Sequence, residues 1–275
     1  MRFDIETIWI NGVQIFPSSA YYANLTGLKS FTKTNETSDL IGDGAYLGNS
    51  KIEPKTLTLT ACTKKRYDIE NDFLLSQLLS TKDILLNVKI KGFNSILEMY
   101  VNAESYSEDD FGTMTAVLKA YDPYLYVKDE KEVSLKARRH NDDFNFKTNN
   151  FNLAGSFNFK NEYVSGSKSE IMNKSYITLY PIIKVKGLCS NLTVTNETTG
   201  EILKVNYSVA EGDTLEIDCN PKTRGVYLYS ADGKSKNLIT YKVGKFISLV
   251  CGSNILSASY NGTADVLVKW KEKFN

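Results

Sequence analysis

The sequence contains a single histidine, His140, which narrows the catalytic chemistry open to it. A Ser-His-Asp or Cys-His arrangement would have to use this residue as its base. His140 lies in a charged stretch next to Arg139 and Asp142, whereas a catalytic base needs a fixed and partly desolvated position. The sequence also lacks a Gly-x-x-x-x-Gly-Lys-Ser/Thr phosphate loop. We therefore expect no enzyme activity, no catalytic residue and no cofactor.

Cysteine is scarce as well. Cys62, Cys189, Cys219 and Cys251 show no C-x-x-C spacing, and at least Cys62 and Cys219 end alternating apolar segments where a small hydrophobic residue fits. Buried free thiols are the preferred interpretation, with a disulfide between C-terminal cysteines as the alternative. We expect no metal site, because one histidine cannot complete a common ligand set.

Excess charge and long apolar runs are also missing. The 33 basic and 32 acidic residues leave a formal charge of +1, and only five of the basic residues are arginine. A nucleic-acid-binding protein normally has a strongly basic face, and bidentate phosphate capture normally uses arginine. No apolar run approaches the roughly 18 residues of a membrane span, and the first six residues do not resemble a signal peptide. We expect no nucleic-acid contact, no membrane contact, and synthesis in a cytoplasm.

Four acidic residues near one strand end are the remaining candidates for catalysis. They are Glu104, Glu108, Asp109 and Asp110. Paired carboxylates act as acid and base without a histidine. Three of these four are consecutive and precede Gly112, so a hairpin turn is the preferred interpretation.

The strongest pattern in the sequence is an alternation of apolar and polar residues with a period of two. Apolar residues alternate with mostly polar ones in segments 57–61, 86–90, 97–103 and 114–120. This pattern is typical of half-buried antiparallel strands. The N-terminal half is therefore predicted to be a β domain.

One segment, from Asp68 to Ser80, departs from this rhythm. Asp68 suits the N-cap of a helix, and Glu70 and Asp72 suit its first turn. The apolar positions that recur at helical spacing are Ile69, Phe73, Leu74, Leu78 and Leu79. We predict a single amphipathic helix packed on a sheet in an otherwise all-β protein.

The chain is expected to divide into two domains, 1–130 and 131–275. Mixed charge runs follow Tyr126, and the segment from Lys128 to about Asn150 lacks periodicity, as expected of a solvated connection. Strands return from Ser175. The hairpin dipeptides Asp232-Gly233 and Asn261-Gly262 favour type I′ turns, so the second domain is predicted to be a β-sandwich.

The closing strand of this sandwich contains Trp270. Val266, Val268 and Trp270 share one face of the strand, whereas Asp265 and Lys269 mark the other. We expect the indole to point into the core together with Leu249 from an adjoining segment. The alternative is an exposed tryptophan at a sugar site or a protein interface.

The sequence between residues 246 and 270 resembles the C-terminal signature of the distal tail proteins (Dit) of siphophages. Leu249 comes shortly before Gly252, Asn254 follows that glycine, and a hairpin turn at Asn261 leads to a strand that ends at Trp270. Further segments fit the same family in the same order: the aromatic Asp-Pro-Tyr phrase 120–126, and segments 180–187, 194–200 and 212–218.

The resemblance implies a structural protein of the virion tail tip or baseplate. Its N-terminal domain would form a ring, expected to be a hexamer, under the tail tube protein. Its C-terminal domain would be a galectin-like sandwich that docks a tail-associated tip protein or receptor-binding proteins. The polar, glycine-bearing segment Thr34–Lys55 is either a surface loop, undetected strands, or an arm that reaches a neighbouring subunit, which the resemblance favours.

The runner-up function is a carbohydrate-binding module that recognises a host surface. Four tyrosines of the C-terminal half, Tyr227, Tyr229, Tyr241 and Tyr260, are able to stack on sugar rings. Tyr227 and Tyr229 alternate with Val226 and Leu228, so they face away from the aliphatic side chains. They are equally suited to cover a protein interface.

Overall fold

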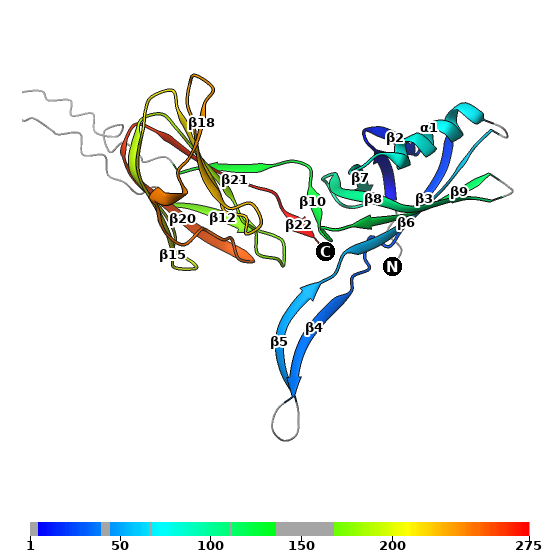
Figure 1. The fold of residues 1–275 in the computed structure, drawn as a ribbon, viewed down its shortest axis with the longest axis horizontal. Helices are drawn as coiled ribbons and strands as arrows, with labels where there is room; N and C mark the ends of the chain where they lie inside the picture. The colour runs from blue at the N-terminus through cyan, green and yellow to red at the C-terminus, as the bar shows by residue number, and fades with distance from the viewer. Residues whose placement is uncertain (1–4, 40–44, 66–67, 110–111, 136–167, 275) are drawn as a thin grey trace, which may run out of the picture. The chain divides into compact units, whose positions relative to one another are not determined.

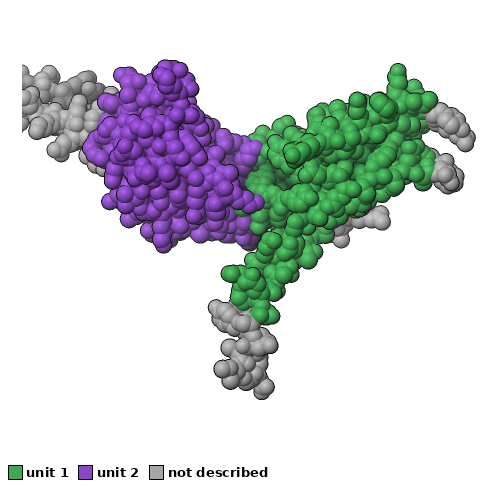
Figure 2. Space-filling view, viewed as in Figure 1, with its two compact units in different colours: residues 1–129, 273–275 green, residues 130–272 purple. Residues whose placement is uncertain are grey.

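The computed structural model describes two compact units, each with its own hydrophobic core. The first unit comprises residues 1–129 and 273–275, and the second comprises residues 130–272 (Figure 2). Within these limits the structure describes residues 5–39, 45–65, 68–109, 112–135 and 168–274. The predicted all-β class with one helix in the N-terminal part is confirmed.

The first unit is built on an antiparallel sheet of nine strands with the order β2-β1-β7-β8-β9-β6-β3, in which β10 pairs with both β8 and β22. The strands are β1 (Ile5–Ile10), β2 (Val13–Phe16), β3 (Tyr21–Thr26), β6 (Lys55–Thr63), β7 (Ile84–Ile90), β8 (Leu97–Glu108), β9 (Thr113–Ala120), β10 (Leu125–Val127) and β22 (Lys273–Phe274). The predicted alternation is confirmed in β6 and β9, where Leu57, Leu59 and Ala116 are buried and the threonines between them face the other way.

Helix α1 (Ile69–Ser80) covers the buried face of this sheet. Its predicted N-cap is confirmed, because Asp68 Oδ1 accepts a hydrogen bond from the Asn71 backbone N–H at 3.5 Å. The predicted core face is partly wrong. The helix buries Leu75 and Leu79, whereas Ile69, Phe73 and Leu74 are 75%, 68% and 39% exposed. Apolar residues occupy both sides of this helix, and periodicity did not distinguish the side that faces the sheet.

Strands β4 (Lys33–Asp39) and β5 (Ala45–Ile52) form a separate two-stranded sheet. They project from the first unit as a hairpin (Figure 1). We call residues 33–52 the arm. The polar segment Thr34–Lys55 therefore contains a hairpin with two regular strands. For the described strands, this excludes the alternative of a structureless loop.

The second unit is a sandwich of two antiparallel sheets around one core. One sheet has the order β11-β21-β13-β16-β17-β18, and the other has the order β12-β20-β14-β15-β19. Their strands are β11 (Lys131–Ser134), β12 (Lys168–Asn173), β13 (Ile182–Lys186), β14 (Cys189–Asn196), β15 (Glu201–Val209), β16 (Thr214–Asp218), β17 (Gly225–Tyr229), β18 (Ser235–Asn237), β19 (Lys242–Gly244), β20 (Gly252–Gly262) and β21 (Asp265–Trp270), with a short helix η1 (Ile239–Tyr241).

The prediction of a solvated connection is wrong for its first residues, which start at Lys128. Residues Lys131–Ser134 form β11, which pairs with β21, and Leu135 is fully buried in the core of the second unit. The charge run is ordered because its charges are paired: Lys131 contacts Glu272 at 2.6 Å, and Lys269 contacts Glu130 at 3.1 Å. The rest of the predicted connector, residues 136–150, lies outside the described residues.

The C-terminus also departs from the expected division. The last strand, β22, belongs to the first unit, where it pairs with β10. Phe274 packs edge-on against Phe93 with ring centroids 5.4 Å apart. The sandwich is therefore inserted between β10 and β22, and the predicted second domain does not extend to residue 275.

Candidate assembly surfaces

Of the acidic residues considered for catalysis, Glu104 and Glu108 lie in β8, and Asp109 begins the hairpin turn that follows it. Glu104 is ion-paired with Lys119 at 2.8 Å. Asp109 accepts a hydrogen bond from the Thr113 backbone N–H on its Oδ1 at 2.8 Å, and its own N–H donates to the Thr113 carbonyl at 3.1 Å. The turn interpretation is confirmed for Asp109, while Asp110 and His140 lie outside the described part of the chain. Among the described residues, no cluster of His, Cys, Asp or Glu is arranged to hold a metal ion.

The cysteines are all unpaired thiols. Cys189 and Cys219 are buried, and burial raises their pKa to about 11 and about 12, so both are unreactive at neutral pH. Cys62 is half-buried. The prediction of buried thiols is wrong for Cys251, which is exposed because it lies in the loop that precedes β20. In the described ranges no helix is long and apolar enough to cross a membrane.

The four tyrosines weighed for sugar stacking do not converge on one site. Tyr227 and Tyr229 lie on the outer face of β17, as the alternation predicted. Tyr241 lies in η1, where it packs edge-on against Tyr207 with centroids 5.1 Å apart. Tyr260 lies in β20 and donates a hydrogen bond to the Ala264 carbonyl at 2.7 Å. Tyr260 therefore has a structural role, and the other three belong to two different surfaces.

The aromatic Asp-Pro-Tyr phrase surrounds the strand that receives the C-terminus. Tyr126, in β10, donates a hydrogen bond from its hydroxyl to Asp122 Oδ2 at 2.9 Å. Burial, together with the Asp122 charge, raises the pKa of Tyr126 well above its usual range, so this donor keeps its proton. Lys273 of β22 lies 4.5 Å from the ring centroid of Tyr124. The phrase thus fixes β10 and helps to hold β22 in the first unit.

The C-terminal signature holds a loop against the sandwich through buried asparagines. Asn254 is fully buried, and its Nδ2 donates to the carbonyls of Val250 and Gly252 at 2.8 and 3.1 Å. Its Oδ1 accepts the Val250 N–H at 2.9 Å and the Asn196 side chain at 3.3 Å. Asn196 also donates to the Ser248 carbonyl at 2.7 Å. The loop before β20 therefore has its backbone groups satisfied by side chains, which strand pairing alone does not provide.

Replacing Asn254 with alanine is expected to lower the stability of the second unit by about 2 to 4 kcal/mol. The change leaves several buried backbone groups without a partner, and each such group costs about 1 to 3 kcal/mol. Asn254→Asp should cost a similar amount, because a carboxylate cannot donate to the two carbonyls. Denaturant unfolding of the full chain measures the change. Asn206→Ala, at an exposed position of β15, is the control, and an equal loss in that variant would contradict the assignment.

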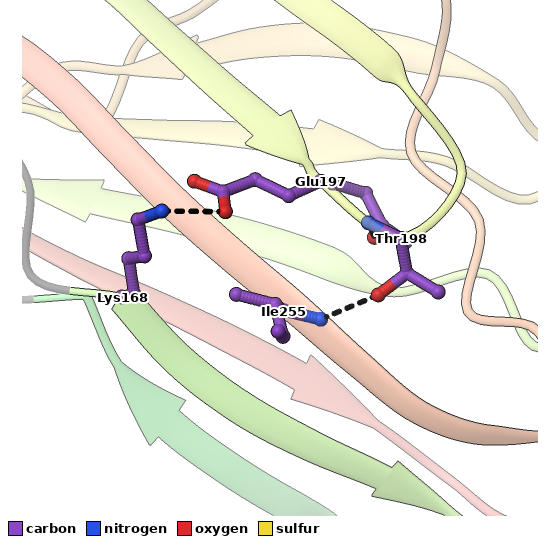
Figure 3. A network of polar contacts seen from close by, with 5 residues as sticks. Lys168, Glu197, Thr198 and Ile255 are labelled. Carbon is purple, nitrogen blue, oxygen red and sulfur yellow. Dashed lines mark hydrogen bonds and ion pairs between the residues drawn. The ribbon is translucent and has the colours of Figure 1, made fainter.

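The turn between β14 and β15 reinforces the same sheet (Figure 3). Glu197 is ion-paired with Lys168 of β12 at 2.7 Å. The Ile255 backbone N–H, in β20, donates to Thr198 Oγ1 at 3.0 Å. In Figure 3 the contact between Lys168 and Glu197 crosses the strand that carries Ile255. The segments of the second unit that carry the family resemblance therefore have structural roles: their side chains stabilise the sheet that contains β20.

The arm is a solvent-exposed element of the first unit wherever its side chains are described. Its described side chains from Lys33 to Thr37 and from Gly48 to Lys51 are all solvent-exposed. Among the side chains that the structure describes, polar cross-strand contacts add to the backbone pairing, such as Ser50 Oγ to Asn35 Oδ1 at 2.7 Å and Asn49 to Glu36 at 3.3 Å. An isolated two-stranded hairpin is marginally stable in water. Its geometry therefore suits an element that acquires a packing partner.

A second exposed surface lies on α1. Ile69 and Phe73 are separated by one helical turn on the outward side, and Leu74 is adjacent. Glu70 and Asp72 occupy the first turn of the same helix. Large apolar side chains exposed on one helix face are typical of a surface that is covered by another molecule.

A comparison with protein families finds one match in this chain. Residues 175–274 match the siphovirus-type tail component, C-terminal domain. Residues 175–274 are thus similar to the C-terminal domain of siphovirus-type tail components, and the resemblance predicted from the sequence is confirmed.

Solved structures extend the likeness to the whole fold. The Dit (gp 19.1) protein of phage SPP1, described as a paradigm of the hub adsorption apparatus in phages that infect Gram-positive bacteria, is 14% identical, with 100% of each chain covered and a TM-score of 0.64. A chain of the phage P2 baseplate, in its activated conformation with Ca, is 11% identical, with 99% of this chain and 98% of that chain covered and a TM-score of 0.51. A comparison with curated proteins finds no match.

Proposed function

We propose that this protein is the distal tail component of a phage, or of a phage-tail-like bacteriocin particle, and that it forms a ring at the tail tip. The observation that carries the proposal is the match of residues 175–274 to the siphovirus-type tail component domain. The likeness of the complete chain to a hub protein supports the same role for the first unit. The role is structural, with no catalytic residue, and it places the protein in the virion after synthesis in the host cytoplasm.

The first unit is proposed to build the ring, with six copies. A ring needs a heterologous contact in which each subunit presents two different surfaces, and only cyclic closure stops such a contact from growing. The arm and the apolar face of α1 are two such surfaces on the first unit. Repetition around the ring multiplies modest contacts between neighbouring copies.

The second unit is proposed to be a docking platform for the tail-associated tip protein or for receptor-binding proteins. Its core is complete without a partner, since Trp270, Leu249 and their neighbours are buried within the unit. Assembly is therefore not required for it to fold. The tail tube protein is the expected partner of the ring on its other side.

Native mass spectrometry and negative-stain electron microscopy of the full chain test this proposal. The expected result is a closed ring of six copies, formed by the chain alone or on addition of the tail tube protein of the same particle. A chain that stays monomeric in both settings, or that is missing from purified tails, would count against it.

A further inference from the structure

One open edge of the sandwich, between β18 and β19, combines the exposed ring of Tyr241 with several cations. β18 is the last strand of one sheet and β19 is the last strand of the other. The short helix η1 connects them, and Leu238 anchors it: this residue is fully buried, and its N–H donates to the Val226 carbonyl at 2.7 Å. The edge is therefore a fixed part of the fold.

Three cations at this edge lie over aromatic rings. Lys242 Nζ is 4.3 Å and Arg224 Cζ is 5.5 Å from the ring centroid of Phe246. Lys236 Nζ is 5.3 Å from the centroid of Tyr207, which in turn packs against Tyr241. Contact with a ring restrains a long flexible side chain while its charge stays available to an anion.

The local charge balance is strongly positive, although the whole chain is nearly neutral. Residues 220–245 contain six Lys or Arg and one acidic residue, Asp232. Asp232 is already paired with Lys234 at 2.7 Å. In the part of the chain that the structure describes, no carboxylate forms an ion pair with Lys242, Arg224 or Lys236.

Carboxylates on the flanking strands are engaged elsewhere. Glu201 of β15 accepts hydrogen bonds from the Ser248 N–H and hydroxyl at 2.7 and 2.9 Å. Asp218 of β16 accepts from the Asn220 N–H and from the Thr223 hydroxyl. Both carboxylates accept from backbone and hydroxyl donors. The Lys242 ammonium also donates to the Gly244 carbonyl, but a carbonyl carries no net charge, so the positive charges of Arg224, Lys236 and Lys242 are not neutralised by a described carboxylate.

The shape of the edge decides which anion it fits. β18 and β19 have three residues each, so the edge is only about 10 Å long at roughly 3.3 Å per residue. A stable protein partner covers about 800 Å² on each side, which an edge of this length does not offer. A narrow edge with one exposed ring, that of Tyr241, suits a linear polymer that presents a few units at a time.

We propose that this edge binds an anionic carbohydrate polymer. The phosphate or carboxylate groups of the polymer pair with Arg224, Lys236 and Lys242, and a sugar ring lies against Tyr241, which is 40% exposed. The inference does not rest on ring formation, since every residue in it belongs to the second unit. For a protein at a tail tip, the corresponding ligand is a charged polymer of the cell surface.

Isothermal titration calorimetry of the full chain tests the site with poly(glycerol phosphate), polygalacturonate and neutral dextran. We expect binding to one or both anionic polymers, with affinity that falls as salt rises, and none to dextran. The two anionic arms distinguish phosphate from carboxylate groups. Absence of binding to both would overturn the proposal, and so would binding of a poly-glutamate peptide as tight as that of the polymers.

Charge variants locate the site. The triple variant Arg224→Gln, Lys236→Gln, Lys242→Gln should weaken binding at least tenfold and reduce its dependence on salt. The control triple Lys65→Gln, Lys82→Gln, Lys174→Gln removes the same charge from exposed positions elsewhere and should change the affinity less than twofold. Equal losses in the two variants would mean that only net charge matters, which overturns the site.

A matched pair of tyrosines tests the stacking contact. Tyr241→Ala should weaken polymer binding severalfold. Tyr241→Phe should bind as tightly as the unmodified chain, because the ring makes the contact. Tyr229 is 42% exposed, close to the 40% of Tyr241, but lies on the outer face of β17. Tyr229→Ala should leave binding unchanged, and an effect equal to that of Tyr241→Ala would contradict the location.

Discussion

Replacing Trp270 with alanine is expected to destabilise the second unit strongly while the first unit keeps its stability. The indole is 8% exposed and shares a core with Leu249, Val266 and Val268, so the alternative of an exposed sugar-binding tryptophan is wrong. Truncation of a buried tryptophan to alanine typically costs about 3 to 5 kcal/mol, a large part of the roughly 5 to 15 kcal/mol that holds a domain folded. For a unit of this size the midpoint of thermal unfolding should fall by roughly 10 to 20 °C.

The two tryptophans of the chain make this measurable. Trp9 lies in β1 of the first unit and Trp270 in β21 of the second. In Trp270→Ala, fluorescence therefore follows only the first unit, while protease resistance and circular dichroism follow the second. We expect an unchanged Trp9 transition beside early cleavage within residues 168–272. Leu267→Ala, at a half-buried position on the opposite face of β21, is the control and should have a small effect.

A milder variant isolates the polar part of the side chain. The Trp270 Nε1–H is buried and has no hydrogen-bond acceptor among the described residues. An unsatisfied buried donor costs about 1 to 3 kcal/mol, so Trp270→Phe removes an unfavourable group together with some apolar volume. It should destabilise the unit much less than Trp270→Ala. Equal effects of the two variants would mean that the indole contributes nothing through packing.

Much of the fold follows from local patterns in the sequence. Leu57 and Leu59 alternate with threonines in the sequence. This alternation predicts leucines in the core and threonines on the other face, as the structure has them. Asp68 caps α1 because a carboxylate satisfies an N–H at the start of a helix. These features were predictable because a few neighbouring residues determine each of them.

Features that depend on distant partners were missed. The charge run that includes Glu130 and Glu132 was interpreted as a solvated connection, yet both residues pair with Lys269, which is remote in sequence. Nothing near Phe274 indicates that the last strand joins the first unit, because its partner β10 precedes the whole sandwich. Pairing between segments far apart in the chain has no local signature.

The candidate surfaces were also only partly predictable from the sequence. The arm was among the alternatives because its composition is polar and contains glycine, but its regular pairing, such as Lys33 with Ile52, was not visible in the sequence. The exposure of Ile69 and Phe73 was not predicted, since apolar residues at helical spacing usually face a core. At the edge around Tyr241, only the tyrosine was a signal in the sequence. The cations there come from three separate segments and lie over two different rings.

Removing the arm is expected to abolish ring formation without unfolding the first unit. Replacement of residues 34–51 by a short Gly-Ser linker deletes a hairpin whose strands pair only with each other, so the nine-stranded sheet retains all of its own pairings. The bond from the Glu53 N–H to the Thr32 carbonyl, 2.9 Å, closes the base of the arm next to β6. A short linker is able to span these ends.

The loss of assembly should be large because the arm offers unpaired strand edges along its length. An added strand contributes a row of main-chain hydrogen bonds to the contact between two molecules. Weakening each contact by about 3 kcal/mol would lower its association constant about 100-fold, and a closed ring repeats that loss at every interface. Mass photometry of the full chain and of the arm-deleted chain, at matched concentrations, measures the effect.

A control that preserves the arm makes the result specific. Exchanging the paired residues Asn35 and Ser50, as Asn35→Ser with Ser50→Asn, keeps their polar cross-strand contact and the length of the hairpin, so the ring should persist. An unchanged thermal transition for Trp9 in the arm-deleted chain would show that the first unit is folded. If that folded chain still assembled with undiminished affinity, the contact between copies would have to lie elsewhere, and the apolar face of Ile69 and Phe73 on α1 would be the surface left to carry it.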